Sequence, residues 1–223
     1  MKLVALFSGG KDSIMAVLKA KQEGNEIKYL ATIHSKNPYS YMYHTPNIGL
    51  TLMQSRAMNI QLVSKESSGI KEEEVKDLKI LLNNLDVDGV VCGAISSKYQ
   101  KERVEKVCKE LRLKLITPLW NKKPEDLLRE MLKEGFEIII TAVAAEGFDE
   151  NWLGKRIDEG CLKDLIELNK KYGINIVGEG GEMETFVLDC PLFDKKIQIT
   201  KTEKIWKDNN GIYEIKDAKL IEK

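Results

Sequence analysis

The chain has 223 residues, of which 43% are hydrophobic, so it can bury the core of one large domain or two small ones. Lysine plus arginine and aspartate plus glutamate each number 35; the zero net charge argues against nucleic-acid binding through an overall basic excess. The four cysteines form no CxxC pair, which argues against zinc and disulfides and favours a reducing compartment. Neither a signal-like N-terminus nor a membrane-length apolar run occurs, so we expect a cytoplasmic protein without a membrane anchor.

The first half of the chain alternates between strand-like and helix-like segments. Helices are expected after the first strand, at 72–85, where acidic residues precede apolar ones, and at 98–112. Strands are expected at 3–7, 27–34, 60–63, 88–93 and 114–118. This alternation predicts an α/β domain with a doubly wound, Rossmann-like parallel sheet.

After Pro118 the pattern changes, and we place a domain boundary there: residues 1–118, then a smaller α+β domain of residues 119–223. Pro124, followed by two acidic residues, predicts a helix start, and Gly173 predicts the end of a second helix. Residues 136–145 are strand-like. The alternating residues 196–200 and the Asn-Gly pair within 207–215 predict an antiparallel hairpin.

The hexapeptide SGGKDS, Ser8–Ser13, stands between the first strand and a helix, where phosphate is typically bound. Gly9 and Gly10 let an anion approach backbone N–H groups, and the helix N-terminus attracts it. Ser8 and Ser13 supply hydroxyl donors and Lys11 supplies a charge. A carboxylate beside phosphate makes sense if a cation separates them, so Asp12 predicts a Mg²⁺ ligand. The alternative is a glycine-rich turn with a helix cap. We call this segment the phosphate loop.

The phosphate loop resembles the PP-loop of ATP pyrophosphatases, which cleave ATP between its α- and β-phosphates. Further motifs, in order along nearly the whole chain, resemble those of the diphthine–ammonia ligase family. They are SYMYHTPN (40–47), GAISSKYQKERVE (93–105), PLW (118–120), WLGKRID (152–158) and GEGGEMETFVLDCPLF (178–193). The resemblance implies a PP-loop fold of the HUP type, an enzyme that uses ATP and Mg²⁺, and catalytic roles for Lys11 and Asp12.

Further ATP-binding residues are expected where loops follow the parallel strands, because ligands bind at the carboxyl ends of such sheets. His34 and Ser35 end the second strand, where related PP-loop enzymes hold adenine, mainly through backbone groups. Gly93 lies in the turn after the fourth strand. Arg103 borders the apolar stripe of the next helix and can bind phosphate or carboxylate, unless this is an ordinary solvated helix end.

Two other segments are expected to bind substrate. The aromatic loop that contains Tyr41 and His44 is a candidate clamp for ATP or substrate, or a loop packed under the second domain. Ser96 and Gln100 cluster at the start of the fourth helix. In the acidic segment, GEGGEMET at 178–185, an extended backbone would put Glu182 and Glu184 on one face. These two residues and Glu179 are candidate ligands of a cation, or part of an acidic turn.

The predicted reaction is the ATP-dependent amidation of diphthine on elongation factor 2, because the resemblance implies that substrate and ammonia as partners. In this scheme the diphthine carboxylate attacks the α-phosphate, pyrophosphate leaves, and ammonia displaces AMP to give diphthamide. No nucleophilic cysteine follows Met1, so free ammonia is the expected nitrogen source. The sequence predicts neither a membrane nor a direct nucleic-acid partner, and a homodimer stays open.

Three alternative functions stay open. The first is amidation of a corrinoid precursor, a role suggested for relatives of this family. The second is tRNA thiolation, which needs a sulfur-carrying cysteine and usually a basic RNA surface or a zinc module. The third is a regulatory module that binds ATP without chemistry.

Overall fold

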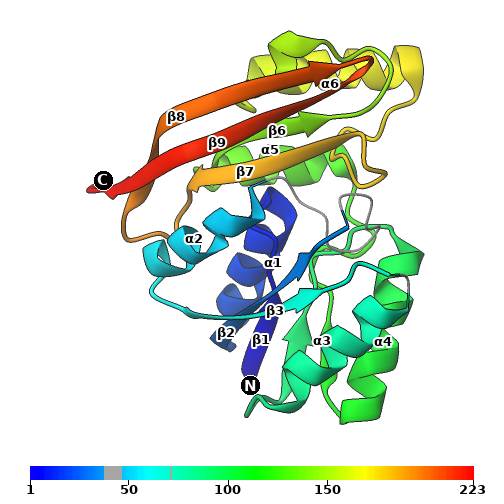
Figure 1. Ribbon diagram of the computed structural model, residues 1–223, viewed down its shortest axis with the longest axis vertical. Helices are drawn as coiled ribbons and strands as arrows, with labels where there is room; N and C mark the ends of the chain where they lie inside the picture. The colour runs from blue at the N-terminus through cyan, green and yellow to red at the C-terminus, as the bar shows by residue number, and fades with distance from the viewer. Residues whose placement is uncertain (38–46, 71) are drawn as a thin grey trace.

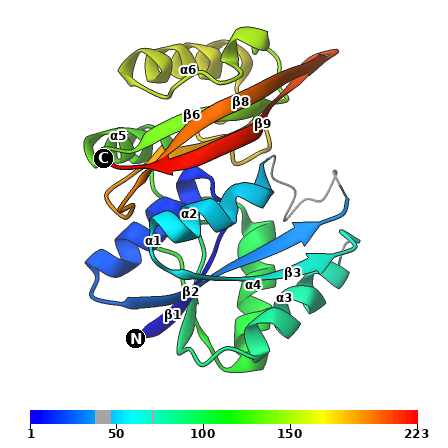
Figure 2. The same ribbon diagram turned by 60° about the vertical axis from the view of Figure 1, so that its left-hand side comes forward.

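The computed structural model describes residues 1–37, 47–70 and 72–223. Figures 1 and 2 show two stacked parts: a parallel sheet with helices on both faces, and above it an antiparallel sheet with α6 on the side facing away from the parallel sheet. The predicted α/β class with a second α+β part is therefore confirmed. No helix in the described part of the chain is long and apolar enough to cross a membrane.

The first part contains the elements predicted from the strand–helix alternation, together with a short helical segment that the sequence pattern did not predict. Its elements are β1 (Lys2–Leu6), α1 (Lys11–Gln22), β2 (Glu26–Ser35), the 3-10 helix η1 (Ile48–Leu50), α2 (Thr51–Ala57), β3 (Gln61–Ser67), α3 (Glu73–Asn83), β4 (Gly89–Val91), α4 (Lys98–Leu111) and β5 (Lys114–Ile116). The strands run parallel in the order β3-β2-β1-β4-β5. The strand order therefore reverses between β1 and β4, which is where open α/β sheets bind ligands.

The second part follows after a short connection. Its elements are α5 (Pro124–Lys133), β6 (Glu137–Val143), the 3-10 helix η2 (Glu150–Trp152), α6 (Glu159–Tyr172), β7 (Met183–Asp189), β8 (Lys196–Lys207) and β9 (Asn210–Ile221). The strands form an antiparallel sheet in the order β7-β6-β9-β8. As predicted, Pro124 begins α5 and Gly173 caps α6 with a positive φ. The boundary at residue 118 stays a prediction.

The β8–β9 hairpin was expected to turn at its Asn-Gly pair, but it turns two residues earlier. Lys207 pairs with Asn210, so Asp208 and Asn209 form the turn, and Asp208 adopts a φ of +54°. Gly211 lies instead in β9, with the ring of Trp206 packed where a Cβ would stand. The glycine is therefore required for packing, and aspartate tolerates the left-handed turn conformation.

Apolar side chains form two clusters on opposite faces of the parallel sheet. The smaller one lies under α3 and α4 and includes Leu78 and Val104. The larger one runs from α1 and β1, with Leu3 and Ile14, into the second part, where it includes Phe186 and Leu162. One continuous core therefore joins the two sheets, and it fixes the phosphate loop relative to β7.

Replacing Leu78 by alanine tests the smaller cluster. Leu78 is fully buried, whereas Ile80 in the same helix is 53% exposed. We expect Leu78→Ala to lower the free energy of unfolding by about 2–5 kcal/mol, because it leaves a cavity. The control Ile80→Ala should change it by no more than about 0.5 kcal/mol. Urea denaturation measures both, and equal losses in the two variants would contradict this description of the core.

Candidate active site

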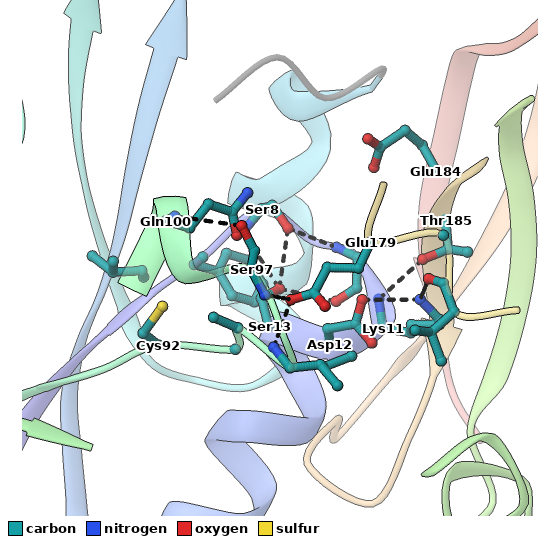
Figure 3. A pocket seen from close by; sticks show the side chains of 18 of the residues that line it. Ser8, Lys11, Asp12, Ser13, Cys92, Ser97, Gln100, Glu179, Glu184 and Thr185 are labelled. Atoms are coloured by element: carbon teal, nitrogen blue, oxygen red, sulfur yellow. Dashed lines mark hydrogen bonds and ion pairs between the residues drawn. The ribbon is translucent and has the colours of Figure 1, made fainter. Parts of the chain in front are cut away.

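A cavity of about 530 Å³ opens where β1 and β4 end, and the acidic segment closes its other side. This volume suits a small-molecule ligand. It is lined by Leu6, Phe7, Ser8, Gly10, Lys11, Asp12, Ser13, Ala31, Ile33, Ile48, Cys92, Gly93, Ala94, Ile95, Ser97, Tyr99, Gln100, Val104, Val177, Gly178, Glu179, Gly180, Gly181, Met183, Glu184 and Thr185. Figure 3 shows side chains of the phosphate loop and the acidic segment converging there.

The phosphate loop leaves backbone donors available to a ligand. Gly10 caps α1 without a side-chain hydrogen bond, and the N–H groups of Asp12 and Ser13 have no acceptor among the described residues. The Ser13 hydroxyl donates to the Gly10 carbonyl (2.9 Å) and lies 3.3 Å from the Ser8 hydroxyl. The loop thus has unpaired N–H groups at the start of α1, with two hydroxyls beside them, as an anionic ligand needs.

Lys11 is engaged with the second part of the protein. Its side chain is 2% exposed, and Nζ donates to Asp12 Oδ2 (2.9 Å) and to the Val177 carbonyl (2.5 Å). A lysine is buried in this way only when its charge is compensated, and Asp12 provides the compensation. The ammonium group therefore lies at the junction between the phosphate loop and the residue before the acidic segment.

One carboxylate oxygen of Asp12 has no hydrogen-bond partner among the described residues. Oδ1 is buried and has no hydrogen-bond partner in the described structure, while Oδ2 binds Lys11. Burial raises the pKa of Asp12 above its usual value, and the Lys11 charge acts in the opposite direction. An unpaired carboxylate oxygen beside the predicted phosphate site fits a Mg²⁺ ion that takes its other ligands from phosphate and water. Among the described residues, no cluster of three or more His, Cys, Asp or Glu side chains forms a metal site on its own.

Strand β7 holds the phosphate loop in place. The N–H of Lys11 donates to Thr185 Oγ1 (3.2 Å), and the N–H of Val187 donates to the Gly9 carbonyl (3.3 Å). Gln54, fully buried on α2, donates from Nε2 to the carbonyls of Gly9 and Val187, both at 2.9 Å. Because Gly9 has a φ of +80° and Gln54 Oε1 occupies the space of a Cβ, only glycine fits there.

Gln54 and Thr185 were not among the predicted site residues. Thr185 ends the acidic segment, and its threonine immediately after the glutamates was an available signal. Gln54 lies in a seven-residue helix with no motif, so nothing in the sequence marks it. Their contacts require knowledge of which strand lies beside the loop.

Glu179 binds the turn before α4. Its carboxylate accepts hydrogen bonds from the N–H groups of Ile95 (2.7 Å), Ser96 (2.7 Å to Oε2) and Ser97 (3.1 Å), and from the Ser96 hydroxyl. These bonds lower the pKa of Glu179 in spite of its partial burial. Glu179, which was predicted to bind substrate, thus joins the two parts of the protein through hydrogen bonds in this structure.

Glu182 and Glu184 do not share a face, contrary to the expectation for an extended segment. Glu182 precedes β7 and turns back, so that Oε1 accepts from the N–H of Asn175 (3.1 Å), and it does not line the cavity. Glu184 lies within β7 and lines the cavity. Burial raises its pKa to about 7, against the opposing effect of Lys11.

The other predicted residues divide into two groups. Gly93, Gln100 and the phosphate-loop residues other than Gly9 line the cavity. Among the described residues outside the lining are Gly9, His34, Ser35, Ser96, Arg103 and Glu182. Tyr41 and His44 lie outside the described residues.

For two of the residues outside the lining, the structure gives a clear physical reason. On β2, side chains alternate between the faces of the sheet, so the side chains of Ala31 and Ile33 reach the cavity and that of His34 does not. Adenine binding by the backbone of His34 stays a prediction. Arg103 stacks on the Tyr99 ring (3.5 Å) and binds Glu72 (2.6 Å). Its guanidinium therefore already has an aromatic and an anionic partner.

Comparison with known proteins gives matches along almost the whole chain. The family model described as diphthamide synthase N-terminal domain matches residues 1–115, and the diphthamide synthase C-terminal domain matches residues 123–221. A rat protein named diphthine–ammonia ligase is 40% identical over 92% of this chain and 85% of its own length. The human protein of that name is 39% identical over 91% and 84%. A solved structure from Methanocaldococcus jannaschii, titled a predicted subunit of tRNA methyltransferase, has 17% identity over 86% of this chain and 98% of its own, with a TM-score of 0.48, too low to support an inference.

Replacing Gly93 by alanine tests the contact between the β4–α4 turn and the phosphate loop. A Cβ at Gly93 would stand 2.9 Å from the carbonyl group of Asp12, so it would push the first turn of α1. We expect Gly93→Ala to weaken ATP binding at least tenfold, about 1.4 kcal/mol, while the protein stays folded. Calorimetric titration with ATP measures this, with Gly49→Ala as the control because no atom lies within 4 Å of a Cβ there. An unchanged affinity of Gly93→Ala for ATP would show that ATP does not bind in this cavity.

Proposed function

Because the chain belongs to the diphthamide synthase family, we propose that it is a diphthine–ammonia ligase, an enzyme that converts diphthine to diphthamide with ATP and ammonia. The observation that carries the proposal is the cavity, because it brings the phosphate loop of the first part against the carboxylates of the second. A nucleotide and a cationic substrate would meet there.

The proposed chemistry begins with activation of a carboxylate. The diphthine carboxylate attacks the α-phosphate of ATP, a bond to the α-phosphorus forms, and pyrophosphate leaves. Ammonia then attacks the acyl carbon, and AMP leaves with the electrons of the broken C–O bond. The N–H groups of Asp12 and Ser13 and the hydroxyls of Ser8 and Ser13 bind the β- and γ-phosphates and so stabilise the charge of the departing pyrophosphate.

Mg²⁺ is proposed as the metal, held through Asp12 Oδ1, where it would neutralise phosphate charge. Lys11 favours the ionised form of Asp12 against the effect of burial and holds the carboxylate in place, because its ammonium lies 2.9 Å from Oδ2. We also propose that Lys11 moves its charge toward phosphate when ATP enters, since ATP offers stronger acceptors than the Val177 carbonyl that Lys11 binds here.

Thiolation of tRNA is disfavoured by the state of the cysteines. All four are buried, and Cys92, which lines the cavity, has a pKa raised by burial. Sulfur transfer needs an accessible thiolate, so a cysteine that stays protonated in an apolar site is a poor carrier. Amidation of a corrinoid precursor uses the same activation chemistry and stays an alternative acceptor reaction.

We propose elongation factor 2 as the protein that carries the diphthine substrate and the cytoplasm as the place of the reaction. Both follow from the nature of the modified residue, which sits on a factor used in translation. We also propose a homodimer, to which we assign no particular surface.

Neutralising Asp12 tests the activation step. We expect Asp12→Asn to lower the rate of AMP and pyrophosphate formation by about 10²–10³, because the variant loses the ionised oxygen proposed to hold Mg²⁺. The assay follows release of labelled pyrophosphate from ATP in the presence of diphthine-containing elongation factor 2. The control is Asp164→Asn on α6, which removes the ion pair between Asp164 and Lys155. A variant that forms AMP at the wild-type rate would rule out this role for Asp12.

The nitrogen source gives a second test. With ATP and the diphthine protein present, ammonium chloride should support diphthamide formation, and glutamine alone should not, because the proposed nitrogen source is free ammonia. Mass spectrometry of the elongation factor peptide detects conversion of the acid to the amide. Full activity with glutamine in ammonium-free buffer would refute the proposed nitrogen source.

A further inference from the structure

Four carboxylates of the phosphate loop and the acidic segment lie in or beside the cavity, and three of them have defined partners. Asp12 binds Lys11, Glu179 binds the turn before α4, and Glu182 binds the N–H of Asn175. Glu184 lines the cavity and has no hydrogen bond or ion pair among the described residues. In Figure 3, no dashed line reaches the carboxylate of Glu184. Glu184 is therefore the carboxylate among the four that is available to a cationic reactant.

Glu184 and Thr185 are adjacent residues of β7, and both line the cavity. Adjacent residues of a regular strand point to opposite faces. Opposite this pair, however, β6 contains a bulge: Thr185 pairs with Ile140 and Glu184 with Ala142, so Thr141 is the extra residue. The bulge bends β6 and adds local twist to the sheet beside Glu184, and bulges are frequent beside active sites. Thr185 contacts the phosphate loop while Glu184 lines the same cavity one residue away.

The proposed reaction requires a proton acceptor at this place. Ammonia is present at neutral pH mainly as ammonium, which has no lone pair with which to attack a carbonyl. An ionised carboxylate first binds ammonium by charge and then takes its proton. Asp12 and Glu179 are poor candidates. Asp12 is already paired with Lys11, and the N–H groups around Glu179 lower its pKa, which makes its carboxylate a weak base.

We propose that Glu184 is the general base that receives ammonium and deprotonates it for attack on the activated diphthine carboxyl group. The inference rests on the proposed function. A proton passes from ammonium to Glu184, and the N–C bond then forms. The nitrogen loses a second proton to the departing AMP phosphate as the C–O bond breaks, so amide and AMP result and the charges balance.

The electrostatic surroundings support this role. The charged groups that act on Glu184 are Lys11 and Asp12, both on α1, and burial outweighs them to give a pKa of about 7. A base near the working pH is the most effective acid–base catalyst, because it is both ionised and able to hold a proton. The carboxylate is free to bind a cation above this pH and is protonated below it.

The test uses Glu184→Gln and compares ammonia with hydroxylamine, which is uncharged at neutral pH and needs no prior deprotonation. Exchange of labelled pyrophosphate into ATP reports the activation step separately. We expect this exchange and hydroxamate formation with hydroxylamine to stay close to wild-type rates. Amide formation from ammonium at pH 7 should fall by about 10²–10³, and it should recover as pH rises and free ammonia increases.

Two further variants complete the design. Glu214→Gln, which removes an exposed ion pair with Lys216 on β9, is the matched control and should behave as wild type. Glu184→Asp keeps a carboxylate and should use ammonium better than Glu184→Gln does. If Glu184→Gln does not fold, Glu184→Asp provides the test. Its rate of amide formation from ammonia must then fall while its rate of hydroxamate formation does not.

The outcomes against the proposal are distinct. Loss of pyrophosphate exchange in Glu184→Gln would place Glu184 in the activation step, and equal loss with both nucleophiles would show that it only shapes the site. An unchanged ammonia rate would also refute it. If the wild-type enzyme forms no amide from ammonium, the proposed function itself fails, and that result is seen before any variant is made.

Discussion

The structure depends on the attachment of the phosphate loop to a strand that lies more than 170 residues away in the sequence. Lys11 donates from its backbone to Thr185, Gly9 accepts from Val187, and the buried amide of Gln54 joins the carbonyls of Gly9 and Val187. Each bond contributes on the order of 1 kcal/mol, but leaving such buried groups unpaired would cost more. The attachment therefore sets the distance between the nucleotide end of the cavity and the carboxylates of the acidic segment.

Four carboxylates in or beside one cavity would repel one another if all faced the same space. The fold separates them by giving each a different environment. Asp12 has a lysine, Glu179 has backbone N–H groups, and Glu182 turns into its own loop, whereas Glu184 keeps only burial and the charges on α1. Titratable groups whose surroundings push their pKa values apart are those that take different catalytic roles. The differences here arise from backbone geometry rather than from residue type, since three of the four are glutamates.

Sequence reasoning was most successful where the signal was local. The strand–helix alternation, the place of residues 8–13 between β1 and α1, and the start of α5 at Pro124 all depend on patterns within a few residues. The failures involve contacts that no local pattern encodes. Ile33 lines the cavity but was not among the predicted residues, and Gln54, which binds the phosphate loop, has no motif that marks it. The turn of the β8–β9 hairpin was misplaced because Gly211 is needed to accommodate Trp206, a packing requirement that resembles a turn signal in the sequence.

The larger apolar cluster ignores the division of the chain into two matched family segments. Side chains of β1 and α1 belong to the same cluster as those of β6, β7 and α6. Cutting the chain between residues 116 and 124 would therefore expose apolar surface on both fragments, and each fragment would tend to aggregate or to recombine with the other. Exchange of either half between relatives succeeds only when the residues on both sides of this shared core are exchanged together, so the two halves are expected to have coevolved as one folding unit.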